Sequence, residues 1–60
     1  STLQHARNAI LQLLADNKPH SITDLHTLQL QKDYLDTALE ALLSEEEIFI
    51  NGSEIGRRGR

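Results

Sequence analysis

Residues 34–45, YLDTALEALLSE, and residues 48–55, IFINGSEI, decide the fold, because a helical pattern stands directly before a hairpin pattern. Apolar residues in the first stretch recur at the i, i+3, i+4, i+7 and i+8 spacing, which places them on one stripe of a helix. They are Leu35, Ala38, Leu39, Leu42 and Leu43. Counted from a start at Lys32, this stretch predicts a long amphipathic helix whose stripe faces the core.

The opposite face of this helix is acidic. It carries Asp33, Asp36, Thr37, Glu40 and Ser44. Lys32 and Asp36 stand at the i, i+4 spacing of an ion pair on a helix surface. Residues 31–56 hold one lysine against seven carboxylates, whereas residues 57–60 hold three arginines. The predicted charge is therefore negative on the third helix and positive at the end of the chain.

After residue 47 the apolar period changes from 3.6 to 2, which predicts strands. Asn51-Gly52 lies between the two apolar runs, and this dipeptide favours a two-residue type I′ turn. Such a loop would pair Ile50 with Ser53 and Ile48 with Ile55. We expect the three isoleucines to face the core and Phe49 to point the other way, toward solvent or a partner.

Two further helices are predicted before this unit. The first runs from about Thr2 to Asp16 and ends at Asn17-Lys18-Pro19, where Asn17 tolerates a left-handed conformation. Its inward residues are Leu3, Ala6, Ile10, Leu13 and Leu14.

The second predicted helix is short and covers residues 24–28, with the Thr23 hydroxyl as its cap. Ile22 forms a very short strand or an extended entry before it. Leu25 and Leu28 face inward, and the turn at residues 29–31 buries Leu30.

Length and composition predict one small domain over residues 1–60, a fragment of a longer protein. The chain has no cysteine, so disulfides and thiolate zinc sites are excluded, and a reducing compartment is favoured. Its longest apolar runs are two or three residues, far below the roughly 18 that span a bilayer. We expect a cytoplasmic location, or one in the nucleoid or nucleus.

The order of elements resembles the winged helix-turn-helix superfamily across essentially the whole chain. Its core spacing is matched by Ile22-Thr23-x-Leu25-x-x-Leu28-x-Leu30 and then Leu35-x-x-x-Leu39-x-x-Leu42-x5-Ile48. The resemblance implies an α+β, mainly α fold of three helices plus a C-terminal β-hairpin wing. It also implies duplex DNA binding by a regulator or DNA-processing protein, with the third helix in the major groove and the wing on the backbone or minor groove.

By this resemblance the groove-facing positions fall on Lys32, Asp33, Asp36, Thr37 and Glu40. Gly-flanked arginines at residues 56–60 are typical of segments that grip phosphates or enter a narrow minor groove. The first hypothesis is therefore a DNA-binding domain that contacts duplex mainly through the wing and the basic tail. The predicted DNA-binding residues are Lys32, Thr37, Asn51, Arg57, Arg58 and Arg60.

A second hypothesis is that the domain binds a protein partner. Three carboxylates on the third helix would repel phosphates, and only one of them is expected to be useful as an acceptor from cytosine. In this hypothesis the interacting residues are Asp33, Asp36, Glu40 and Phe49. Oligomerisation through the parent protein is possible under either hypothesis.

Catalysis and cofactor binding are not expected. His5, His20 and His26 lack the i, i+4 spacing of metal ligands, and no cysteine joins them. The chain has no Gly-rich phosphate loop and no nucleophile with a suitably placed base. The sequence therefore predicts a binding domain that is not an enzyme and holds no metal.

Overall fold

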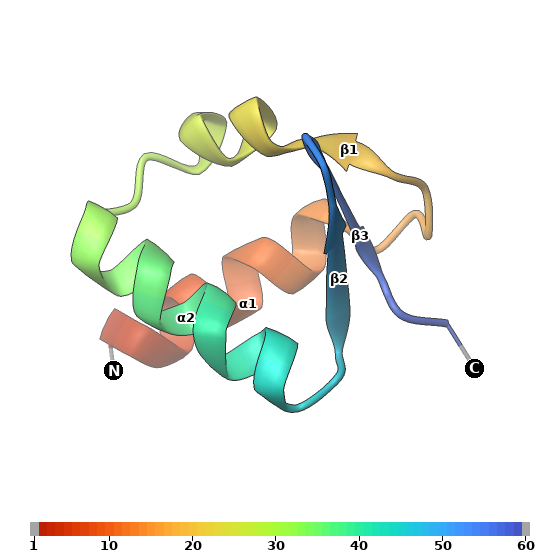
Figure 1. The fold of residues 1–60 in the computed structure, drawn as a ribbon. Helices are drawn as coiled ribbons and strands as arrows, with labels where there is room; N and C mark the ends of the chain where they lie inside the picture. The colour runs from red at the N-terminus through yellow and green to blue at the C-terminus, as the bar shows by residue number, and fades with distance from the viewer. Residues whose placement is uncertain (1, 60) are drawn as a thin grey trace.

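The computed structural model describes residues 2–59, which form three helices and a small antiparallel sheet. The elements are α1 (Thr2–Leu13), β1 (His20–Ser21), the 3₁₀ helix η1 (Ile22–Leu28), α2 (Lys32–Ser44), β2 (Ile48–Asn51) and β3 (Glu54–Arg57). Figure 1 shows α2 in front of α1, η1 above them and the hairpin β2–β3 at one end. The predicted mainly helical α+β class with a C-terminal hairpin is confirmed, and its topology is compatible with a winged helix.

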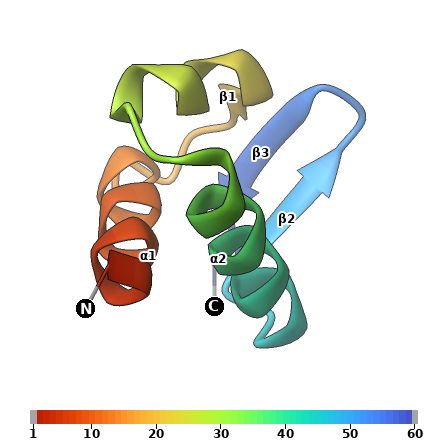
Figure 2. The ribbon, with the colours of Figure 1, turned by 90° about the vertical axis from the view of Figure 1, so that its left-hand side faces the viewer.

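One core lies where α1, α2, η1 and the sheet meet. Figure 2 shows α1 and α2 side by side, with η1 across one end and the hairpin beyond α2. The buried side chains of the core are all aliphatic: Ala6, Ile10, Leu14, Leu25, Ala38, Leu42, Ile48 and Ile55. Gly56 is also buried. Because no polar side chain is buried among the described residues, packing of aliphatic groups holds these elements together.

The α2 stripe is narrower than the sequence predicts. Ala38 and Leu42 are buried, whereas Leu35 and Leu39 are half-buried and Leu43 is 39% exposed. The expectation that all five residues face the core is therefore wrong for Leu43, and Leu35 and Leu39 meet it only in part. The physical reason is that α1 and the sheet cover only the part of the stripe centred on Ala38 and Leu42.

The hairpin loop lies one residue later than predicted, so each residue of β2 pairs two residues further along the chain than expected. The loop is Gly52-Ser53, and Asn51 is the last residue of β2, paired with Glu54. Gly52 has φ +63° and is the one loop residue in the left-handed region. Positive φ at Gly52 alone, and not at Ser53, is typical of a type II′ turn, so the predicted type I′ turn at Asn51-Gly52 is wrong.

This register sets the two faces of the sheet, whose strand order is β1-β3-β2. Ile48 and Ile55 are buried as predicted, but Ile50, opposite Ile55, is 39% exposed and lies beyond the core. Phe49 pairs with Gly56 and lies on the opposite face, as predicted.

The short second helix is a 3₁₀ helix whose start lies two residues before the predicted one. Its N-cap is Ser21, whose hydroxyl accepts from the Thr23 N–H, so the predicted Thr23 cap is wrong. β1 ends directly before it, and the Ile22 N–H donates to the Ser53 carbonyl, which ties η1 to the hairpin loop. Leu25 is buried as predicted, but Leu28 and Leu30 are only half-buried.

The first helix ends three residues before the predicted boundary, and a turn covers residues 14–16. Asn17 then adopts φ 61°, the left-handed conformation expected at this stop. Across residues 2–59, no helix combines the length and apolar character that crossing a membrane requires.

Candidate interaction surface

The outward face of α2 is acidic, and its one lysine is paired with one of the carboxylates. Asp33, Asp36 and Glu40 are all exposed. The Lys32 Nζ lies 2.7 Å from Asp36 Oδ2, as the i, i+4 spacing predicts. This hydrogen bond, together with the Asp36 charge, raises the pKa of Lys32 above its usual value. The one cation of α2 is thus already paired, and Asp33 and Glu40 remain exposed beside it.

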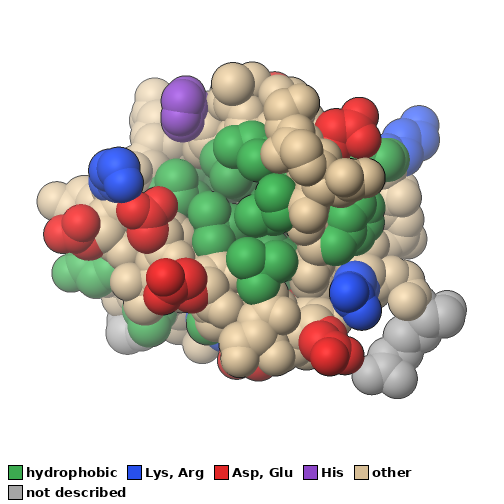
Figure 3. Space-filling view, in the orientation of Figure 1, with side chains coloured by type: hydrophobic (Ala, Val, Ile, Leu, Met, Phe, Trp, Pro, Cys, Tyr) green, Lys and Arg blue, Asp and Glu red, His purple; other side chains and the backbone are tan. Residues whose placement is uncertain are grey.

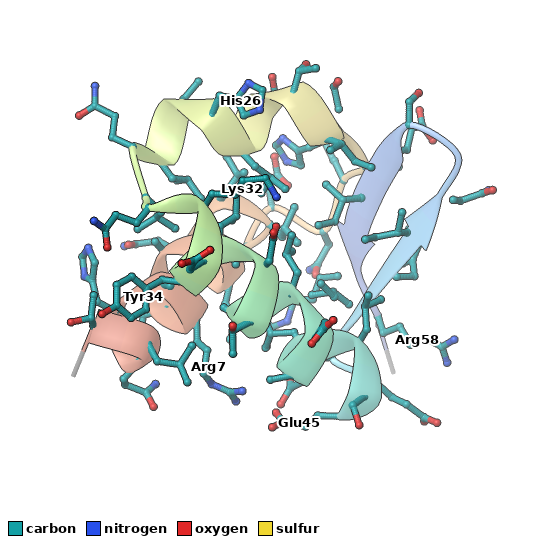
Figure 4. The ribbon with its side chains drawn as sticks, turned by 60° about the vertical axis from the view of Figure 1, so that its left-hand side comes forward. Arg7, His26, Lys32, Tyr34, Glu45 and Arg58 are labelled. Atoms are coloured by element: carbon teal, nitrogen blue, oxygen red, sulfur yellow. The ribbon has the colours of Figure 1, made fainter. Side chains whose placement is uncertain are left out.

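An apolar groove of about 340 Å³ runs between η1 and α2, beside the acidic face. Its lining residues are Ile22, Leu25, His26, Leu30, Lys32, Leu35, Asp36 and Leu39. Figure 3 shows hydrophobic side chains gathered in the middle of this face, with charged side chains around them. In Figure 4, His26 on η1 and Lys32 at the start of α2 lie on opposite sides of the groove.

The sequence pattern did not reveal this groove, although it held one signal for it. The helix of 13 residues carries five apolar positions. They form a stripe that is too wide for the neighbouring elements of so small a domain to cover completely. Leu35 and Leu39, the flank of that stripe, became the floor of the groove.

The hairpin loop offers no cation to a phosphate. Asn51 and Ser53 are exposed at the loop, and the neighbouring charged residue is Glu54. Phe49 is half-buried, and its ring lies close to Gly56. A Cβ built on Gly56 would lie 2.6 Å from the Phe49 Cζ. The phenyl ring therefore covers Gly56, and only part of it is available to a partner.

Arg57 and Arg58 lie at the other end of the hairpin. They are exposed, and the Arg58 N–H donates to the Glu47 carbonyl oxygen. Both line a polar hollow together with Asn17, Glu45, Glu46, Glu47 and Gly59. Within residues 2–59 neither arginine has an ion-pair partner, but three carboxylates stand around the same hollow. Arg60 lies outside the described residues.

Other ion pairs connect separate elements. Arg7 on α1 donates to both carboxylate oxygens of Glu45 at the end of α2, at 2.8 and 3.1 Å (Figure 4). This contact lowers the pKa of Glu45 and raises that of Arg7. His20 on β1 lies 3.0 Å from Asp16 Oδ1 and 3.7 Å from Asp24 Oδ2, and its hydrogen bond lowers the pKa of Asp16.

The predicted DNA-binding residues do not form one surface. Lys32 and Thr37 belong to α2, Asn51 ends β2, and Arg57 with Arg58 lies at the opposite end of the hairpin. The predicted protein-binding carboxylates, by contrast, share the outward side of α2, while Phe49 lies apart on the sheet. In the described part of the chain, no three histidines, aspartates or glutamates are grouped to hold a metal ion.

Comparisons with protein-family models, curated protein sequences and solved structures give no match to this chain.

Proposed function

We propose that this domain is a protein-interaction module that receives a positively charged partner on the outward face of α2. One observation carries the proposal: Asp33, Asp36 and Glu40 are exposed on this face, and the only cation of the helix is paired with Asp36. A partner bearing arginine or lysine would pair with Asp33 and Glu40, which have no ion-pair partner among residues 2–59.

The same face suits duplex DNA poorly. Neutralisation of phosphates supplies most of the sequence-independent affinity for DNA, and carboxylates in a groove lined with phosphates act against it. The apolar groove beside the acids adds no phosphate contact. A contiguous exposed apolar patch with a polar rim is instead typical of protein interfaces.

The test uses two probes on isotope-labelled domain: an alanine-based helical peptide with arginines four residues apart, and a generic DNA duplex. At about 50 mM salt, where charge contacts are strongest, we expect the peptide to shift the amide signals of α2 and the duplex to leave them unchanged. Neutralising the face with Asp33→Asn, Asp36→Asn and Glu40→Gln should abolish the peptide shifts.

A matched control removes three carboxylates elsewhere, with Glu46→Gln, Glu47→Gln and Glu54→Gln. It changes the net charge equally, so peptide binding should persist if position matters and net charge alone does not. Equal loss in both triple variants, or a duplex that binds more tightly than the peptide through α2, contradicts the proposal.

Duplex DNA binding is the second candidate. It is favoured by the topology and by Arg57 and Arg58, which are exposed and lack an ion-pair partner among the described residues. If these arginines bind phosphates, Arg57→Ala with Arg58→Ala should weaken binding to all sequences and flatten the salt dependence by about two units. Adding Arg60→Ala should flatten the salt dependence by about one more unit. Lys32→Ala should change the salt dependence little, because Lys32 is already paired with Asp36.

A further inference from the structure

The groove between η1 and α2 is an apolar surface that the fold leaves uncovered. Ile22, Leu30, Leu35 and Leu39 are each half-buried, and all four line it. They pack against the core from one side, so their other side faces the groove. Completing their burial would remove more apolar area from water, which favours binding by a partner that brings apolar groups.

The size of the groove limits what it can hold. Its volume of about 340 Å³ is at the lower end of the range for small-molecule sites, roughly 300–1,000 Å³. Along α2 it runs from Lys32 to Leu39, which is about 10 Å at the helical rise of 1.5 Å per residue. Two turns of a partner helix match that length, with apolar anchors at i, i+3 or i+4, and i+7.

Charge around the groove indicates how such a helix is built. On the α2 side Asp36 lines the groove together with Lys32, with which it is paired. Glu40 follows one turn later on the exposed side of α2 and has no ion-pair partner among residues 2–59. The η1 side contributes the exposed His26 and no carboxylate to the lining. A partner helix would therefore carry arginine or lysine on the flank that faces α2 and neutral residues on the flank that faces η1.

We infer that the η1–α2 groove binds an amphipathic partner helix, with the apolar side chains of that helix seated on Leu35 and Leu39 and its basic flank paired with Glu40 and, alongside Lys32, with Asp36. This inference rests on the proposed function, since it specifies the partner of the same face. It adds an apolar component that charge pairing alone does not require.

The experiment compares two synthetic helical peptides with identical arginines. One has leucine at four positions spaced i, i+3, i+4 and i+7, and the other has alanine there. Calorimetry on the whole chain should give at least about tenfold tighter binding for the leucine peptide, because only it buries apolar area in the groove. Methyl spectra of the unmodified domain should then shift at Ile22, Leu35 and Leu39.

Two variants locate the site. His26→Trp adds bulk at an exposed rim position and should weaken the leucine peptide at least about tenfold without unfolding the domain. Leu43→Gln is the matched control, because Leu43 is exposed on α2 but does not line the groove, and it should leave binding unchanged.

Equal affinity for the two peptides overturns the groove inference and leaves charge-driven docking intact. Binding of neither peptide overturns the proposed function as well. Methyl shifts at Ile50 or Leu43 in place of the groove residues would place the apolar contact elsewhere. Self-association in sedimentation, with groove methyl shifts that depend on concentration, would make a second copy of the chain the occupant and refute the partner helix.

Discussion

Phe49 and Gly56 are paired across the hairpin, and the Phe49 ring lies close against Gly56. The pair lies on the face of the sheet opposite Ile48, and a Cβ at Gly56 would meet the ring at 2.6 and 2.7 Å from Cζ and Cε2. Aromatic rings commonly cover a glycine on a neighbouring strand in this way. The half-buried Phe49 is thus a structural residue of the sheet.

Gly56→Ala should therefore lower the free energy of unfolding by about 1–3 kcal/mol, because the added methyl group displaces the Phe49 ring. Chemical denaturation measures this change in the free energy of unfolding. Gly59→Ala is the control, since nothing lies within 4 Å of a Cβ built there. In a Phe49→Ala background the effect of Gly56→Ala should largely vanish, and an unchanged effect there would show that the ring is not what the methyl group meets.

Arg7 and Glu45 join the first helix to the end of the third. Because Arg7 lowers the pKa of Glu45, the pair stabilises the folded state above the ordinary carboxyl pKa, and this stabilisation is lost as the pH falls through the lowered pKa. Arg7→Gln should thus lower the melting temperature near neutral pH and have almost no effect at about pH 2.

The measurement is a series of thermal melts of both proteins across the acid range. Asp16, whose pKa His20 lowers, is unchanged in the variant and contributes the same acid dependence to both melts. A difference in melting temperature that stays constant from neutral pH to the acid limit would mean that the arginine acts through packing alone.

At the scale of elements, α2 ends in a Schellman motif. The Glu47 N–H donates to the Leu42 carbonyl and the Glu46 N–H to the Leu43 carbonyl, while Glu46 has φ 59°. Glycine is preferred at that left-handed position, and an acid there opposes the helix dipole. The chain turns toward β2 at this position, and Glu46 adopts an unfavourable backbone conformation there.

Glu46→Gly should raise the free energy of unfolding by about 1 kcal/mol, because it relieves the left-handed strain of a residue with a Cβ. Glu46→Ala separates the causes, since it removes the charge but keeps the Cβ and should give less stabilisation. If the alanine variant equals the glycine variant in denaturant melts, charge and not backbone conformation determines the effect.

The hairpin loop gives a second test at this scale. Gly52→Val should destabilise the domain by about 1–3 kcal/mol, because a β-branched residue resists φ +63°. Asn51→Val should be tolerated, since Asn51 lies in β2 and pairs with Glu54. Equal damage from both substitutions in thermal melts would favour the type I′ turn at Asn51-Gly52 over the observed register.

For the molecule as a whole, the division of α2 into a buried strip and a groove flank predicts a difference between neighbouring leucines. Leu42→Ala should lower the free energy of unfolding by about 2–5 kcal/mol, because Leu42 is fully buried and its removal leaves a cavity. Leu39→Ala should have a clearly smaller effect, since Leu39 is already partly exposed in the groove. Denaturant unfolding that ranks Leu39 above Leu42 would show that the groove is closed in solution.

The sequence by itself determined the order and type of the elements. Helical spacing at residues 35–43, alternation after residue 47 and a glycine in the loop are local signals, and each needs only neighbouring residues to be understood. The Lys32–Asp36 pair and the left-handed Asn17 were predictable for the same reason. Ser21 shows the limit even of local signals, because Ser21 and Thr23, two residues apart, are both suitable caps for one helix.

Only the tertiary structure decided which apolar residues are covered and which charges meet. Leu39 and Leu42 occupy equivalent positions of the apolar pattern in the sequence. In the structure Leu42 is buried, whereas Leu39 lines the groove. The hairpin register pairs Phe49 with Gly56, and Arg7 pairs with Glu45, 38 residues further along the chain. Burial and pairing between distant segments depend on how whole elements pack, and no residue pattern within one element contains that information.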